Sequence, residues 1–246
     1  MKPKDVPICE CGDDLVDIRV VGGINFGPPP ECPETEPDYC LVRREVYRKL
    51  LRLQDSLPAP YRLRLYEGLR SHGVQSMLFE QEKQRVRARY PHLLPEAVHD
   101  EATILVSPVV RWDGTMNTPP HSTGGAVDVE VVDGDGKVLD YGMEIKDWSV
   151  VAPELCTPNC MSLSDTAKRN RALLTQLMVR EDFVPYEHEW WHFSYGDQYW
   201  AYYRRRDFAL YGKCTPEMIA LARAGANGSN AQPVDRVDLR QIAALR

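Results

Sequence analysis

The segment YEHEWWHFSYGDQYW, which begins at Tyr186, carries two histidines and a glutamate at a spacing that can bind and use a metal ion. His188, Glu189 and His192 fit the pattern H-E-x-x-H, in which two histidines one helical turn apart bind zinc and the glutamate acts as a base. The neighbouring residues disfavour a helix, because a proline precedes the motif, a glycine follows it closely, and the aromatic residues have low helix propensity. The helical zinc motif is therefore the less favoured of two interpretations.

The second interpretation takes ligands from two segments, of which the first is HSTGGAVDVEV. His121 and Asp128 flank a Gly-Gly pair, and residues seven apart on a straight strand would point to opposite faces. The glycines permit a bend that brings both side chains to one point. With His192 they give two imidazole nitrogens and one carboxylate oxygen, a set that leaves a fourth position open for water. Glu189 can then take a proton from that water without binding the metal.

Together, HSTGGAVD and EWWHF resemble the D-alanyl-D-alanine dipeptidases, the VanX-type branch of the zinc D,D-peptidases. The pattern of that family is S-x-H-x6-D, followed far downstream by E-x-W-H. The resemblance implies that one zinc ion per chain is bound by His121, Asp128 and His192. It also implies that Glu189 is the catalytic base.

A third part of the resemblance lies around Arg70, where LYEGLRS is similar to the D-x-x-R segment of the family. By that resemblance Arg70 stabilises the oxyanion that develops during the reaction, and the match covers roughly residues 15–212. The chain departs from the pattern at Glu67, where the family has aspartate, and at Pro119, where it has serine. In the family such positions shape the substrate pocket, so the departures concern the substrate more than the metal.

The resemblance implies hydrolysis of D-alanyl-D-alanine, or of a similar short D,D-dipeptide, by metal-activated water. A dipeptidase must also bind the free ammonium group of its substrate, for which Glu67 and Asp147 are candidate contacts. One alternative is a D,D-carboxypeptidase or peptidoglycan peptidase with the same metal centre. Another is a non-catalytic zinc-binding module, which the presence of Glu189 disfavours.

The composition is that of a globular protein, with 43% hydrophobic and 27% charged residues in a chain of 246. The net charge is −6 and no basic stripe is present, so we expect no nucleic-acid partner. No apolar run approaches about 18 residues and no secretory signal begins the chain, so we expect a cytoplasmic protein without membrane contact. Seven irregularly spaced cysteines favour free thiols over a zinc site. The sequence does not indicate an oligomeric state.

Hydrophobic periodicity predicts an α+β fold, a single domain with a mostly antiparallel central sheet flanked by helices. We expect helices over residues 41–57, 75–89, 95–106 and 164–180 (with Ser162 or Ser164 as its cap), and strands over 16–21 and 61–69. The segment AVDVEVVDGDGKVLDYG predicts a hairpin at DGDG.

Two further expectations concern the C-terminal part. WHFSYGDQYWAYYRR predicts two aromatic strands with a turn at Gly196-Asp197. Residues 1–223 are expected to form the zinc D,D-dipeptidase domain. Residues 224–246 are expected to form a flexible linker and a short terminal helix.

Overall fold

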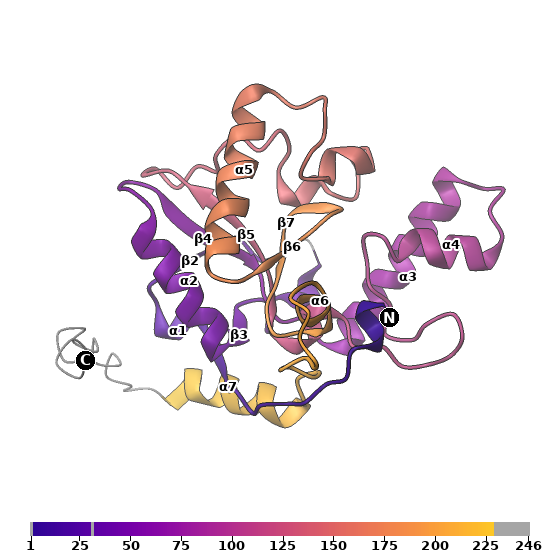
Figure 1. The fold of residues 1–246 in the computed structure, drawn as a ribbon, viewed down its shortest axis with the longest axis horizontal. Coiled ribbons are helices and arrows are strands. Elements are labelled where there is room, and N and C mark those ends of the chain that lie inside the picture. Colours follow the sequence, from indigo (N-terminus) through magenta and orange to yellow (C-terminus); the bar gives the residue numbers. More distant parts are fainter. Residues whose placement is uncertain (1, 31, 229–246) are drawn as a thin grey trace.

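The computed structural model describes residues 2–30 and 32–228, and a five-stranded sheet forms its centre (Figure 1). The strand order is β2-β4-β5-β7-β6, and every neighbouring pair is antiparallel except β2 and β4. The strands are β2 (Asn25–Phe26), β4 (Arg62–Glu67), β5 (Ala126–Val132), β6 (Val184–Tyr186) and β7 (Glu189–Ser194). The predicted α+β fold with a mostly antiparallel sheet is confirmed.

Two helices build the main hydrophobic core against this sheet, α2 (Arg44–Ser56) and α5 (Asp165–Arg180). Along β5 the apolar residues alternate, and Val127, Val129 and Val131 all belong to the core. Because successive side chains of a strand point to opposite faces, Asp128 is directed away from this core. The sheet thereby separates a hydrophobic face from the face that carries the polar site.

The helices α3 (His72–Arg89) and α4 (Pro95–Ala102) form an arm that stands apart from the sheet, on the far side from α2 (Figure 1). The arm has a small core of its own, which consists of Leu78, Phe79, Val86, Val98, Ala102 and Val106. Trp148 packs against this cluster and also against the main core. It therefore connects the arm to the body of the molecule.

The remaining elements lie outside the five-stranded sheet, the two core helices and the arm. An antiparallel pair joins β1 (Leu15–Asp17) to β3 (Leu41–Arg43). The other α-helices are α1 (Ile18–Val21), α6 (Gln198–Tyr203) and α7 (Pro216–Gly228), and the 3-10 helices are Pro3–Asp5, Pro33–Thr35, Pro120–Thr123, Ile145–Asp147 and Pro153–Cys156. Within the described ranges, no helix is long and apolar enough to cross a bilayer. None of the seven cysteines forms a disulfide.

Three predicted boundaries on the N-terminal side were wrong. The strand expected over 16–21 ends at Asp17, because the carboxylate of Asp17 accepts a hydrogen bond from the Arg19 amide and starts α1. The helix expected from Leu41 is preceded by β3, whose residues pair with β1. The helix expected over 95–106 ends at Ala102, where the chain turns along the edge of a cavity.

The structure also corrects the C-terminal expectations. The second arm of the hairpin at DGDG is reduced to one bridge between Val132 and Val138. The second aromatic segment is the helix α6 and not a strand, because Asp197 caps it by accepting a hydrogen bond from the Trp200 amide. The expected linker begins within α7, which continues through Gly228. The expected terminal helix lies outside the described residues.

Candidate active site

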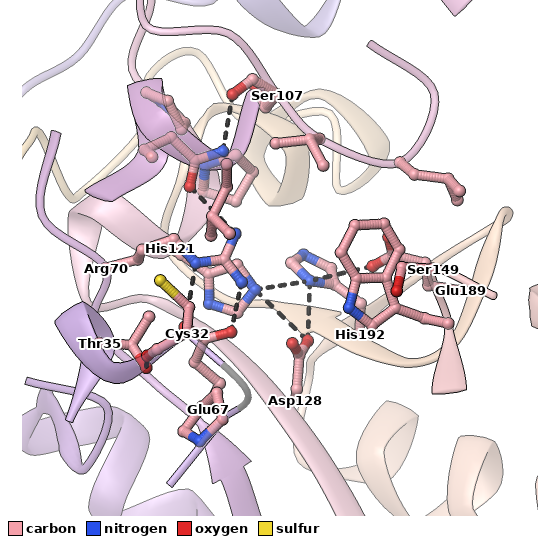
Figure 2. Close-up of a pocket in the computed structure, with 18 of the residues that line it drawn as sticks. Cys32, Thr35, Glu67, Arg70, Ser107, His121, Asp128, Ser149, Glu189 and His192 are labelled. Carbon is pink, nitrogen blue, oxygen red and sulfur yellow. Dashed lines mark hydrogen bonds and ion pairs between the residues drawn. The ribbon is translucent and has the colours of Figure 1, made fainter. Parts of the chain in front are cut away.

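Three predicted ligands converge at one point of the sheet, where Figure 2 shows His121, Asp128 and His192 directed toward one another. His192 Nδ1 lies 3.0 Å from Asp128 Oδ1 and 3.1 Å from His121 Nε2, and His121 Nε2 lies 3.4 Å from Asp128 Oδ1. A tetrahedral metal with bonds of about 2.0–2.1 Å separates its ligand atoms by about 3.3 Å. The three side chains are therefore spaced as the donors of a metal site are, and all three are buried.

The Gly-Gly bend is present and explains how His121 and Asp128 meet. His121 lies in the 3-10 helix Pro120–Thr123, which ends at Gly124 with a φ of 69°. That left-handed conformation is favourable for glycine. A Cβ on Gly125 would lie 2.4 Å from the carbonyl oxygen of Tyr195, so the backbones approach too closely for a side chain. The chain thus turns directly from the helix into β5.

Hydrogen bonds orient the imidazoles of the cluster, while burial and neighbouring charges shift their pKa values. His121 Nδ1 donates to the Gly68 carbonyl at 2.7 Å, which leaves the lone pair of Nε2 directed at the cluster. Burial lowers the pKa of His121, but the charge of Asp128 raises it by more, so the pKa lies above its ordinary value. Burial lowers the pKa of His192 and favours its neutral form. Burial opposes ionisation of Asp128, yet the two imidazoles lower its pKa well below the usual range.

Glu189 lies at the start of β7, with Oε2 at 3.7 Å from His192 Nδ1. The two residues share one side of the strand although they are three apart, and the pairing of β6 with β7 shifts register between Pro185 and Tyr186. Burial, together with the negative charge of Asp128, raises the pKa of Glu189 well above its ordinary value. The carboxylate of Glu189 therefore lies next to the cluster, and its raised pKa makes it a stronger base than an ordinary glutamate.

The helical H-E-x-x-H interpretation was wrong, because the motif lies in the hairpin of β6 and β7. The side chain of His188 is 39% exposed, and its Nε2 lies 3.8 Å from the carboxylate of the neighbouring Glu187. It does not belong to the cluster. It lies in the turn between β6 and β7, before the strand that carries His192 begins.

Arg70 lies beside the cluster and is held on two sides (Figure 2). Its Nε and Nη2 donate to the two oxygens of Glu67, with the Nε bond at 3.0 Å, and its Nη1 donates to Gln75 Oε1 at 3.1 Å. Burial lowers the pKa of Arg70, but the charge of Glu67 raises it more, so the guanidinium stays charged. Of its five N–H groups, one on Nη1 and one on Nη2 remain for a ligand.

The cluster, Glu189 and Arg70 line one cavity of about 700 Å³. The first of the two candidate ammonium contacts, Glu67, lines the cavity but is engaged by Arg70. The second, Asp147, is not among the lining residues, although its neighbour Trp148 is. That candidate is not supported by the geometry.

The sequence analysis missed several cavity residues that come from distant segments, namely Glu34, Gln75, Arg85, Trp148 and Tyr186. One signal was available for Gln75, which follows Arg70 by only five residues at the start of a predicted helix. The others are brought to the cavity by tertiary packing alone.

Comparison with known proteins identifies the class of the protein, which is a peptidase. Residues 35–210 match the model of the family described as D-ala-D-ala dipeptidase, and the chain belongs to this family. That range contains the three clustered side chains as well as Glu189 and Arg70. The resemblance inferred from the motifs is confirmed.

Two curated relatives carry the name D-alanyl-D-alanine dipeptidase. The protein from Synechocystis sp. is 28% identical over 238 residues, which cover 85% of this chain and 94% of the relative. The protein from Escherichia coli strain K12 is 36% identical over 74 residues, which cover 30% of this chain and 36% of the relative.

Two solved structures are more distantly similar. VanYB in complex with D-Alanine-D-Alanine has a TM-score of 0.40 and 16% identity, and the match covers 68% of this chain and 79% of that one. A mutant of the vancomycin resistance D,D-pentapeptidase VanY in complex with Zn(II) has a TM-score of 0.40 and 13% identity. That match covers 85% of this chain and 97% of the other.

Proposed function

We propose that this protein hydrolyses D-alanyl-D-alanine, or a similar short D,D-dipeptide, with one zinc ion bound by His121, Asp128 and His192. The observation that carries the proposal is the 3.0–3.4 Å spacing of the three donor atoms in the cavity that also holds Glu189 and Arg70. Membership of the D-ala-D-ala dipeptidase family and two curated relatives of that name support the substrate. All five residues lie within residues 1–223, which we propose as the catalytic domain.

The donor set fits zinc, since two imidazole nitrogens and one carboxylate oxygen are ordinary zinc ligands that leave a position open. Zinc, when bound there, lowers the pKa of a water molecule toward about 7 and polarises the peptide carbonyl. Glu189 takes a proton from the attacking water through its carboxylate and then delivers that proton to the nitrogen of the leaving amine. Its raised pKa favours the first of these transfers.

Arg70 stabilises the carbonyl oxygen as that atom becomes negative. The two N–H groups that Glu67 and Gln75 leave unused are available for this contact. Glu67 fixes the plane of the guanidinium and keeps it charged, so the donors need no reorganisation during the reaction. Glu67 therefore acts on Arg70 and is not proposed to bind the substrate ammonium.

The test is release of D-alanine from D-alanyl-D-alanine by the purified protein, with chelated protein and Glu189→Ala beside it. We expect release by the metal-loaded protein and none above background in either control. If the protein binds about one zinc per chain but releases no D-alanine, the proposed substrate is wrong and the proposed metal site is unaffected. Release from a longer D,D-peptide in preference to the dipeptide would instead favour the D,D-carboxypeptidase.

A further inference from the structure

Arg43 is a fully buried arginine of β3 that does not line the cavity of the metal cluster. Its guanidinium makes five hydrogen bonds, so each of its five N–H groups has an acceptor. One acceptor is the carbonyl oxygen of Thr123, and the others belong to Glu10, Asp13 and Gly212. Because a buried charge is costly unless it is fully bonded, these partners fix both the place and the plane of the guanidinium.

We call residues 120–124, which carry His121, the ligand turn. Arg43 contacts the end of the ligand turn at two points. Its Nε donates to the Thr123 carbonyl at 2.8 Å, and its backbone amide donates to the Gly124 carbonyl at 2.9 Å. Thr123 is the last residue of the 3-10 helix, and Gly124 is its C-cap. The two bonds therefore hold the chain where it bends from His121 into β5.

The rest of the guanidinium is bound by two segments that are distant in the sequence. Glu10 accepts from Nη1 and Nη2 at 3.1 and 3.0 Å, and the Asp13 carbonyl accepts from Nη1 at 2.6 Å. The ring of Tyr211 lies against the guanidinium, with its centroid 4.8 Å from Cζ of Arg43. The Tyr211 hydroxyl donates to the Asp13 carboxylate at 3.0 Å. Arg43 thereby joins the ligand turn to a part of the molecule that does not touch the cluster.

The ligand turn positions more than one group of the site. The Arg70 amide donates to the His121 carbonyl at 3.2 Å, and the Ser122 hydroxyl donates to the Arg70 carbonyl at 2.9 Å. A shift of the turn would also move His121 Nε2, which lies 3.4 Å from Asp128 Oδ1. Metal ligands must lie within about 0.2 Å of their ideal distances, so a small shift is enough to weaken binding.

We propose that Arg43 is a positioning residue of the metal site, which holds His121 at the distance from Asp128 and His192 that zinc requires. This inference rests on the proposed function, because it takes His121 as a zinc ligand. Arg43 lies outside the cavity, so its replacement removes no ligand and no group that faces the substrate. Loss of hydrogen-bonding partners around metal ligands typically lowers metal affinity about 10- to 100-fold.

The experiment measures zinc affinity in Arg43→Lys and Arg171→Lys by competition with a chromophoric chelator. Arg171 is the matched control, because it is also buried and its guanidinium also donates to backbone carbonyls, those of Tyr141, Leu155 and Thr157. Lysine keeps the charge in both cases but lacks the forked arrangement of donors. Both substitutions should lower the Tm, but only the first removes a contact of the ligand turn.

We expect zinc affinity to fall about tenfold or more in Arg43→Lys, and to be unchanged in Arg171→Lys. Arg43→Gln and Arg171→Gln form a second pair that buries no charge, so the comparison remains possible if lysine prevents folding. An equal loss of affinity in the two members of a pair would overturn the proposal, because general destabilisation would then explain it. Unchanged affinity in the Arg43 variants would also overturn it.

Hydrogen exchange in the metal-free protein separates this proposal from the proposed function. The amides of Ser122, Gly124 and Gly125 donate to acceptors within or next to the ligand turn, so their exchange reports whether the turn is held. We expect faster exchange at these amides in Arg43→Lys than in Arg171→Lys. If the parent protein binds no zinc but this difference occurs, the proposed metal site is wrong and the role of Arg43 in holding the turn stands. If the parent binds zinc and the two variants exchange equally, the positioning role alone is wrong.

Discussion

Asp128 and His192 are direct cross-strand partners in β5 and β7, and Asp128 Oδ1 lies 3.0 Å from His192 Nδ1. A sheet register therefore sets the distance between two of the proposed ligands. Because register is fixed by the hydrophobic alternation of β5, the same residues that build the core also position the site. Of the three proposed ligands only His121 lies outside the sheet, and the bend at Gly124 brings its side chain to the other two.

Replacing the carboxylate ligand tests this arrangement. In Asp128→Asn we expect zinc content to fall from about one ion per chain to below about a tenth, because the amide is a poor ligand and lacks the charge. Asp147→Asn is the control, since Asp147 does not line the cavity. Elemental analysis after dialysis measures both. Equal zinc in the two variants would exclude Asp128 as a ligand.

Loss of Arg70 should slow the reaction without removing the metal. We expect Arg70→Ala to lower kcat by about 10² to 10³, with zinc content unchanged. Arg85→Ala is a matched control, because Arg85 lines the same cavity and pairs with Glu82 at the same spacing as Arg70 pairs with Glu67. Similar losses in both variants would argue against a specific role for Arg70.

The same substitution should also reduce stability, since it leaves Glu67 buried without its partner. An uncompensated buried charge costs on the order of 3–5 kcal/mol of unfolding free energy. Adding Glu67→Gln removes that charge, so the double variant should regain stability but not activity. Urea unfolding and D-alanine release measure the two effects separately. Recovery of activity together with stability would show that Arg70 has only a structural role.

Metal affinity should depend on pH through His121. Burial lowers the pKa of this imidazole, but the charge of Asp128 raises it by more. In the metal-free protein the pKa of His121 therefore lies above its ordinary value of 6.5. A metal ion must displace the imidazole proton, so affinity falls as the pH is lowered. Competition with a chromophoric chelator should therefore show weaker zinc binding at pH 6 than at pH 8. Constant affinity over this range would contradict neutral His121 as the ligand form.

Gly125 should not tolerate a side chain. A Cβ at this position would lie 2.4 Å from the Tyr195 carbonyl oxygen, so Gly125→Ala must displace the backbone between His121 and Asp128. Overpacking of this kind costs about 1–3 kcal/mol. We expect a lower Tm and weaker zinc binding, while Gly225→Ala, in the helix α7 and with nothing within 4 Å, should lower neither. Unchanged zinc affinity in Gly125→Ala would show that the bend does not position the ligands.

The sequence predicted which residues come together in the site, but it did not predict the residues that surround them. His121, Asp128 and His192 could be grouped because the donor types and the glycine bend are local signals. Their roles, with those of Glu189 and Arg70, stay predictions. Most walls of the cavity could not be predicted, because residues such as Glu34 and Arg85 reach it only through tertiary packing.

The errors in the fold have a similar physical origin. Aromatic residues after Gly196 favoured a strand by propensity, yet the Asp197 cap and burial of Trp200 produce α6. The helix expected from Leu41 begins later because β3 pairs with a strand distant in sequence. Long periodic helices and the sheet face were predictable, whereas ends set by single caps and distant partners were not.

The most direct test is a titration of metal-free protein with zinc, in which D-alanine release from D-alanyl-D-alanine is measured at each step. We expect the rate to rise with added zinc and to saturate at about one ion per chain. We also expect Glu189→Ala to bind the same amount of zinc and to release no D-alanine above background. Saturation of binding at one zinc per chain without any release, or equal release by Glu189→Ala, would contradict the proposed function.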